Sequence, residues 1–297
     1  MDKYLSSYNL LNKDGSFKIV SIGGGLTAGA RDGGLYRNGQ LTSFANLIAI
    51  QMKTEFKQPF FDEKDFNGFG YKVLSSMSNG VPKYKVVSNN LAILRAEPNI
   101  ELNPFKGEID NWSLPFTGFY DWGFDRDIVL NASNPYKSRI LLNTTQYGKN
   151  NQLYQITNQN FDFFLMESGF DTYLNAILAS TTFTSSTANN LTPPNYTQFL
   201  KYALSIGAKG VMATIPDIID FPIAKFILAE DIRKKNQIEV YVRSTSNPNS
   251  AVIPIELGSF FLPTPLADSL MDVKIPVSKK RGLSYDNPLL NNRLVSS

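Results

Sequence analysis

The first regular pattern of apolar residues in the sequence is a short run that ends at three glycines. Residues 17–22 are rich in β-branched and aromatic side chains, which predicts a buried strand. Gly23, Gly24 and Gly25 follow at once, and a strand that enters a glycine-rich turn often begins a parallel α/β sheet. Between residues 43 and 56, apolar side chains recur at helical spacing. The pattern therefore predicts a first strand–turn–helix unit.

The same alternation of strand and helix continues through the second half of the chain. Residues 161–166 form an apolar run that predicts a second buried strand, and residues 210–215, which end at Pro216, predict a third strand of the parallel type. Between them, apolar residues from Phe199 to Leu204 mark a helix that Gly207 stops. Further helices are predicted at 171–178 and 223–235, and further strands at 238–243 and 251–256, the last two as a candidate hairpin. Strands that alternate with helices predict an α/β fold with a central parallel sheet.

Residues 57–135 interrupt this alternation. They are rich in Asn, Gly, Pro and aromatic residues and show little periodicity, apart from short strand candidates at 86–87 and 91–94. Long loops within compact domains are usually functional. We therefore expect a single domain over residues 1–297 that carries a loop-rich insertion at about 57–135.

The composition excludes several kinds of catalytic and metal site, whereas for the fold it indicates only a globular protein. Hydrophobic residues make up 42% of the 297 positions and charged residues 19%, which is typical of a globular protein. The chain contains no cysteine, so thiolate catalysis and thiolate metal sites are excluded. It also contains no histidine, the usual general base and the commonest metal ligand. A Ser-His-Asp triad cannot be built from these residues.

Charge and hydropathy give no sign of nucleic acid or of a membrane span. The net charge is +3, and the one basic cluster, Lys279-Lys280-Arg281, is interpreted as a solvated loop. No apolar run approaches the ~20 residues that cross a bilayer. The first residues, Met1-Asp2-Lys3-Tyr4-Leu5, lack the apolar stretch of a signal peptide. We therefore expect either a cytoplasmic protein or a trimmed mature chain.

Several segments, taken in their order along the chain, resemble the SGNH/GDSL hydrolases. Gly23-Gly24-Gly25-Leu26-Thr27-Ala28-Gly29 resembles the GDSL block that opens this family after its first strand. Residues 32–44 and 58–70 look like a Bacteroidota subgroup that includes many surface lipoproteins. Later family segments are similar to residues 161–176, 207–218, 263–268 and 283–286. The resemblance covers most of the chain and implies a three-layer α/β/α fold with a central parallel sheet.

The positions that carry catalysis in the family are changed here. Gly25 stands at the position of the nucleophilic serine, and Phe116 replaces a glycine whose amide helps to hold the oxyanion. Phe170 stands where the family has an oxyanion-binding asparagine. In the last block Asp286 fits the family's aspartate, but Leu289 sits at the histidine position. Acyl transfer needs a nucleophile, a base and oxyanion donors, so the resemblance implies a chain without catalytic activity.

A retained fold without chemistry implies a binding role. By the resemblance, we expect a scaffold or interaction subunit of a bacterial outer-membrane or cell-surface complex, with other surface proteins as partners. The expected location is the cell surface, outer membrane or periplasm. Two alternatives stay open: a carbohydrate- or lipid-binding module that reuses the esterase cleft, and an active esterase or lipase with unorthodox residues such as a Ser-Lys pair. No cofactor and no nucleic-acid partner are expected.

Three other groups of residues invite a functional interpretation. Asp121, Asp125 and Asp127 lack the spacing of an EF-hand and are interpreted as solvated carboxylates, so no metal is expected. Ser168 and Asp171 adjoin the family's oxyanion position and are interpreted as a strand-end turn, with Asp171 at a helix start. Aromatic residues crowd the stretch around position 120, and the candidate binding residues there are Trp112, Phe119, Tyr120 and Trp122. Core packing and an exposed anchor surface both remain open for these rings.

Overall fold

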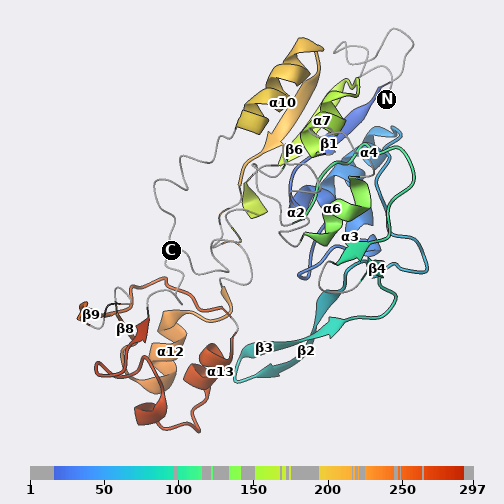
Figure 1. The fold of residues 1–297 in the computed structure, drawn as a ribbon. Coiled ribbons are helices and arrows are strands. Elements are labelled where there is room, and N and C mark those ends of the chain that lie inside the picture. The colour runs from blue at the N-terminus through green and yellow to red at the C-terminus, as the bar shows by residue number, and fades with distance from the viewer. Residues whose placement is uncertain are drawn as a thin grey trace. The chain divides into compact units, whose positions relative to one another are not determined.

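The contacts of the chain gather into two compact units, which are described separately (Figure 1). The computed structural model describes residues 17–95, 100–115, 122, 134–141, 151–167, 169–171, 174, 194–215, 217, 220, 225–243, 247, 249–262 and 264–290. Unit 1 comprises Met1–Lys72, Val86–Tyr173 and Thr184–Ile215, and unit 2 comprises Val73–Lys85, Leu174–Phe183 and Pro216–Ser297. The sequence predicts one domain over 1–297; in the structure each unit has its own cluster of buried apolar side chains.

Unit 1 is built on the predicted parallel sheet. Strands β1 (Ile19–Ile22), β6 (Phe163–Glu167) and β7 (Lys209–Ala213) pair in the order β1-β6-β7, and both pairings are parallel. An extended segment, residues 110–114, runs parallel to β1 on its other side. There the amide of Ser21 donates to the carbonyl of Asp110 at 2.8 Å, and that of Trp112 donates to Ser21 at 2.8 Å. The three predicted strands and the α/β class are confirmed, but every residue of β7 is exposed.

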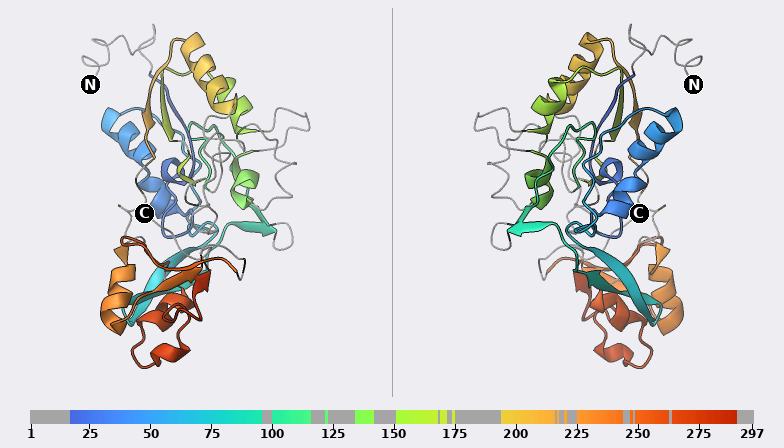
Figure 2. Two further views of the ribbon diagram at one scale, coloured as in Figure 1. Left: turned by 90° about the vertical axis from the view of Figure 1, so that its left-hand side faces the viewer. Right: turned by 90° about the vertical axis from the view of Figure 1, so that its right-hand side faces the viewer.

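Helices pack on both faces of this sheet (Figure 2). One face presents Ile19 and Leu165 to α4 (Phe44–Met52), which buries Ala45 and Ala49 against them. The other face contributes Val20, Ile22, Phe164 and Met166 to the main core, together with side chains of α7 (Gln152–Thr157) and α10 (Pro194–Ser205). The alternation of side chains along a strand thus supplies both cores. The predicted helices at 43–56 and near Phe199 are confirmed; the one at 171–178 lies largely outside the described residues.

The predicted insertion contains more regular structure than its composition indicates. β2 (Tyr71–Ser78) and β3 (Val81–Val87) form a two-stranded sheet around Asn79 and Gly80, which both have positive φ, at 51° and 86°. Asn-Gly is the strongest short-range sign of a tight hairpin turn, so the pair could have been predicted from this dipeptide. The serines of β2, together with Lys72, hide its alternation. Most of this hairpin, Val73–Lys85, belongs to unit 2. The remaining elements of unit 1 are α2 (Gly25–Ala28), α3 (Arg37–Leu41), α6 (Pro135–Ile140) and the paired strands β4 (Ile93–Arg95) and β5 (Glu101–Leu102).

Two pairs of glycines let loop backbones of unit 1 touch. A β-carbon on Gly34 would lie 1.9 Å from the carbonyl oxygen of Gly70. A β-carbon on Gly39 would lie 2.4 Å from the carbonyl oxygen of Gly29, and one on Gly29 would lie 2.5 Å from that of Gly39. No side chain fits at these distances, so the loops that follow β1 are held by direct contact between main chains.

Unit 2 packs two helices against a small mixed sheet. The sheet has the order β10-β8-β9, with β8 (Tyr241–Arg243) parallel to β10 (Leu289–Leu290) and antiparallel to β9 (Val252–Pro254). The predicted strands at 238–243 and 251–256 and their hairpin pairing are confirmed. The helices are α12 (Ala229–Asn236) and α13 (Pro265–Met271), followed by the short 3₁₀ helix η3 (Val277–Lys279). Ile232, Val240 and Leu270 are fully buried in this core.

One lysine of the predicted solvated loop lies inside unit 2. Lys279 and Arg281 are exposed, as expected, but Lys280 is only 1% exposed. Its ammonium group donates to Asn236 Oδ1 at 2.6 Å and to the carbonyl oxygen of Leu270 at 3.2 Å. Both acceptors lie at carboxyl ends of helices, α12 and α13, where a positive charge is favoured. The interpretation of this loop is therefore wrong for Lys280.

Candidate functional site

The strand order of unit 1 indicates where a site would form. From β1 the chain continues to residues 110–114 on one side of the strand, and then to β6 on the other side. In open parallel sheets, ligands bind outside the carboxyl ends of the strands at the point where the strand order reverses in this way. Here that point lies between the ends of β1 and β6. Gly23, Gly24 and Gly25 follow β1, and Glu167 to Asp171 end and follow β6.

Two carboxylates of the chain occupy this position. The amide of Gly24 donates to Glu167 Oε2 at 2.9 Å, and that of Gly25 donates to Asp171 Oδ2 at 2.8 Å. The amide of Phe170 donates to Glu167 Oε1 at 3.2 Å. The amides of Gly24 and Gly25 are therefore satisfied from within the chain, by side chains that lie more than 140 residues away in sequence.

Both carboxylates are withdrawn from solvent. Glu167 is 1% exposed and Asp171 is 5% exposed. Burial, followed by the nearby charge of Asp171, raises the pKa of Glu167 to about 7, although the amides of Gly24 and Phe170 oppose the shift. Glu167 thus changes its charge near neutral pH, a range in which a chain without histidine otherwise has few groups that titrate.

The glycines are needed for this close approach. A β-carbon on Gly24 would lie 2.8 Å from Asp171 Oδ2, and one on Gly25 would lie 3.1 Å from Asp171 Oδ1. One on Gly23 would lie 2.6 Å from the carbonyl oxygen of Glu167. A serine at position 25 would therefore press on the carboxylate that accepts its own amide hydrogen.

A small cavity lies near this turn, beside Ala28. Apolar side chains, the amides of Gln40, Gln58 and Asn111, and the guanidinium of Arg139 line it, and it has room for about one water molecule. Ser113 also lines it and is 4% exposed, and its hydroxyl has no hydrogen-bond partner. A buried polar atom of this kind is usually satisfied by ordered water. Within the described residues, this cavity is too small for a sugar ring or an acyl chain.

The residues predicted at the degenerate catalytic positions are divided between the two units. Gly25 and Phe170 lie in unit 1 at the switch point, where both are buried and both donate amides to the carboxylate pair. Asp286 and Leu289 belong to unit 2: Asp286 is exposed, whereas Leu289 is buried in β10 opposite Val242. Phe116 lies outside the described residues.

Of the aromatic residues considered as an anchor surface, the structure describes the two tryptophans. Trp112 is 6% exposed and Trp122 is 1% exposed, and both belong to the core of unit 1. Trp112 is drawn inward because its segment is hydrogen-bonded to β1 and its carbonyl accepts from Gln152 Nε2 at 2.5 Å. Of the two interpretations, core packing holds for these two tryptophans and the exposed anchor does not. Phe119 and Tyr120 lie outside the described residues.

Sequence reasoning missed the role of the two carboxylates. Asp171 was interpreted as the first residue of a helix, and Glu167 was not singled out at all. The available sign was a glutamate at the end of the apolar run Phe163–Glu167, because acidic residues are almost never fully buried unless they are paired. A glutamate at the end of a buried strand, beside a switch point, therefore indicates a buried carboxylate with hydrogen-bond partners.

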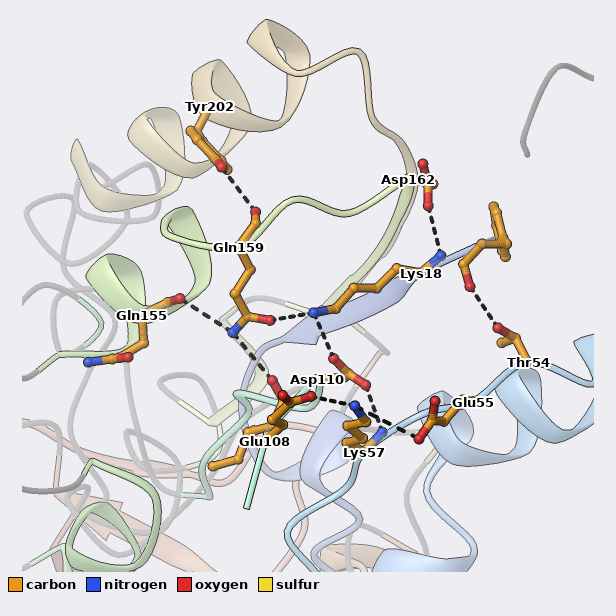
Figure 3. A network of polar contacts seen from close by, with 12 residues as sticks. Lys18, Thr54, Glu55, Lys57, Glu108, Asp110, Gln155, Gln159, Asp162 and Tyr202 are labelled. Atoms are coloured by element: carbon orange, nitrogen blue, oxygen red, sulfur yellow. Dashed lines mark hydrogen bonds and ion pairs between the residues drawn. The ribbon is translucent and has the colours of Figure 1, made fainter. Parts of the chain in front are cut away.

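The other end of the sheet holds a denser polar network, which Figure 3 shows. At the start of β1, the amide of Lys18 donates to Asp162 Oδ2 at 2.7 Å, and its ammonium donates to Gln159 Oε1 at 3.0 Å. The same ammonium lies 3.4 Å from Asp110 Oδ1, while Asp110 Oδ2 accepts the amide of Lys57 at 2.8 Å. These contacts join the amino ends of neighbouring strands, opposite the edge where ligands bind, so we interpret them as structural.

Comparisons with known proteins add no family to this geometry: no protein-family model, curated protein or solved structure matches the chain.

In the part of the chain that the structure describes, no three acidic side chains gather in a way that could hold a metal ion. No helix among the described residues combines the length and apolar character needed to span a bilayer. What the switch point offers chemically is a buried carboxylate pair, in which burial raises the pKa of Glu167 to about 7.

Proposed function

We propose that this chain is a non-catalytic protein on an SGNH-hydrolase-like, three-layer α/β/α fold, and that it acts as an interaction subunit. The observation that carries the proposal is the filled switch point: Asp171 accepts the amide of Gly25, where the resembled family has its nucleophile. Gly25 has no hydroxyl, and the chain has no histidine to activate one.

The sheet of unit 1 supports the fold part of this proposal. Residues 110–114, β1, β6 and β7 lie in the spatial order second, first, third, fourth along the chain, all parallel, with helices on both faces. This is the beginning of one of the two common doubly wound orders. The glycine turn that follows β1 occupies the place of the family's first block.

The setting that we propose is the cell surface or outer membrane of a bacterium, with other surface proteins as partners. The support is the resemblance of residues 32–44 and 58–70 to a surface subgroup of the family. A binding role also fits the chemistry, because the carboxylates fill the donors on which a substrate oxyanion would depend.

The catalytic half of the proposal is tested with the purified chain. We expect p-nitrophenyl acetate to be hydrolysed no faster than in buffer between pH 6 and 9, and a fluorophosphonate probe to leave every serine unmodified by mass spectrometry. A serine esterase assayed in parallel serves as the positive control. Covalent labelling of one serine would reject the proposal and restore the active-hydrolase alternative.

The interaction half is tested in the source cells with a tag at Ser297. We expect the tagged chain to sediment with envelope membranes and, once these are solubilised in mild detergent, to co-purify with a constant set of envelope proteins. An untagged strain sets the background, and a 1 M salt wash removes loosely bound proteins. Recovery of the tagged chain alone from the soluble fraction would reject the interaction role.

A further inference from the structure

The hairpin of β2 and β3 is held to unit 2 at its turn end (Figure 1). Val81 is 1% exposed and packs in the core of unit 2. The ammonium of Lys83 donates to Asp268 Oδ2 on α13 at 2.5 Å, and the side-chain amide of Asn79 donates to Asp268 Oδ1 at 3.5 Å. This end of the hairpin is therefore fixed to α13.

Beyond this anchor, both faces of the hairpin are open. Residues 74–77 of β2 are all exposed, as are Tyr84 and Lys85 on β3. Successive side chains of a strand point to opposite faces, so Leu74 and Met77 project from different faces. Leu74 is 58% exposed and Met77 is 53% exposed. A helix or a lipid surface would cover one of these faces, whereas a strand added at the edge borders both.

The two edges of the hairpin differ in how readily they could pair with another strand. Among the described residues the sheet has two strands, so each strand has one edge without a neighbouring strand. β3 contains Pro82, which has no amide hydrogen to donate, and two lysines, and these features hinder strand pairing. From Val73 to Ser78, β2 contains no proline and no charged residue. The edge of β2 is therefore the one on which another extended chain can pair.

The charge of the hairpin indicates what kind of chain this would be. Residues 73–85 contain Lys83 and Lys85 and no aspartate or glutamate. Lys83 is paired with Asp268, whereas Lys85 is exposed and has no ion-pair partner in the described part of the chain. A strand added at β2 would lie about 9–10 Å across the sheet from β3, a gap that a lysine and a glutamate side chain together can span. An acidic strand therefore complements this surface.

We propose that the edge of β2, residues 73–78, is a docking site for an extended acidic segment of a partner protein, which adds a third strand to the hairpin. Main-chain hydrogen bonds to β2 hold the segment, its apolar side chains pack beside Leu74 and Met77, and a carboxylate faces Lys85. This site lies outside the switch point, and the proposal does not depend on the proposed function.

The experiment uses a synthetic eight-residue peptide, matched to the length of β2, in which valine, threonine and glutamate are interspersed. It is titrated into the isotope-labelled full-length chain and followed by NMR. We expect saturable binding that slows amide hydrogen exchange at residues 73–78 and leaves exchange in β8 unchanged. A peptide that is N-methylated at alternate residues keeps its side chains but cannot pair as a strand, and one with lysine in place of glutamate has the opposite charge. Neither should bind measurably.

Variants separate the contribution of charge from that of apolar contact. Lys85→Glu should weaken binding of the acidic peptide by about two- to tenfold and strengthen binding of the lysine peptide. Leu74→Ser combined with Met77→Ser should weaken binding of the acidic peptide as well. Lys279→Glu and Leu257→Ser, at exposed residues of the same unit, are the matched controls and should leave binding unchanged. If the double variant does not fold, Lys85→Glu and the control peptides decide.

A titration without saturation, or equal binding of the N-methylated peptide, would overturn the proposal. If the acidic peptide does not bind, two further measurements identify another occupant of the hairpin. Protection of residues 73–78 that rises with protein concentration would indicate a second copy of the chain. Sedimentation with phosphatidylglycerol vesicles that is lost in the double variant would indicate a lipid surface.

Discussion

Gly24 and Gly25 present bare backbone to Asp171, and this determines how the turn responds to substitution. Gly25 also lies close to Ala30, whose β-carbon would be 3.3 Å from a β-carbon at position 25. Both neighbours would have to move by a few tenths of an ångström to admit a side chain. Crowding in a well-packed region typically costs 1–3 kcal/mol.

Gly25→Ser is therefore expected to lower the free energy of unfolding by about 1–2 kcal/mol without creating esterase activity. The new hydroxyl meets the Asp171 carboxylate, and no histidine exists to activate it. Urea denaturation of wild type, Gly25→Ser, Asp171→Ala and the double variant tests the crowding directly. If serine costs as much in the Asp171→Ala background as in the wild type, then Asp171 is not the source of the strain.

Arg139 is a second residue whose geometry predicts a measurable effect. Its guanidinium donates to the carbonyl oxygens of Pro59, Phe60 and Asn103, and it lies 4.4 Å from the centre of the Phe61 ring. A lysine ammonium cannot span three carbonyls and a ring face. We expect Arg139→Lys to destabilise the protein by about 2–4 kcal/mol, and Arg281→Lys, at an exposed arginine, to change stability by less than about 0.5 kcal/mol. Equal effects of the two variants in chemical denaturation would contradict this.

At the level of elements, Lys280 connects the carboxyl ends of α12 and α13. We expect Lys280→Met to destabilise unit 2 by about 1–3 kcal/mol. Asn236 Oδ1 would lose the hydrogen bond that it accepts from the ammonium group, and two helix ends would lose a favourable positive charge. Lys279→Met, at the exposed neighbour, is the matched control and should be close to neutral. Thermal melts of the two variants show whether Lys280 is a buried residue that links two helix ends or part of a solvated basic loop.

The elements of unit 1 were largely predictable, and the reasons are specific. β1, β6 and β7 are continuous apolar runs ended by glycine, a carboxylate or proline, and Ser43 caps α4 by accepting the amide of Asn46. The hairpin of β2 and β3, most of which belongs to unit 2, was missed because its strands are mostly exposed and leave no apolar stripe. The contact of Glu167 and Asp171 with the glycine turn was missed because it is a tertiary contact across more than 140 residues.

For the whole molecule, the main consequence of the fold is that the described apolar side chains of the two units form separate cores. The core of unit 1 gathers around the parallel sheet, and that of unit 2 around α12, α13 and β8. A division of this kind was not visible in the sequence, because the residues of unit 2 come from three separate stretches of the chain. Domains with their own cores commonly unfold in separate cooperative steps.

We therefore expect differential scanning calorimetry to resolve two transitions. Ile156→Ala, in the core of unit 1, should shift one transition, and Ile232→Ala, in the core of unit 2, should shift the other. Each side chain is fully buried, so each variant should lose about 2–5 kcal/mol and lower its own transition by about 5 °C or more. A single transition that both variants lower would mean that the two cores unfold as one.

The contacts between glycine backbones in unit 1 also bear on how relatives of this protein could be recognised. Any side chain at Gly34 would collide with the backbone of Gly70. Gly29 and Gly39 exclude side chains from each other in the same way, so these positions must stay glycine while the loops keep their packing. Surface residues, in contrast, can usually be exchanged at little cost in stability. Relatives that keep this loop packing would therefore be recognised by glycines at the positions of Gly29, Gly34, Gly39 and Gly70.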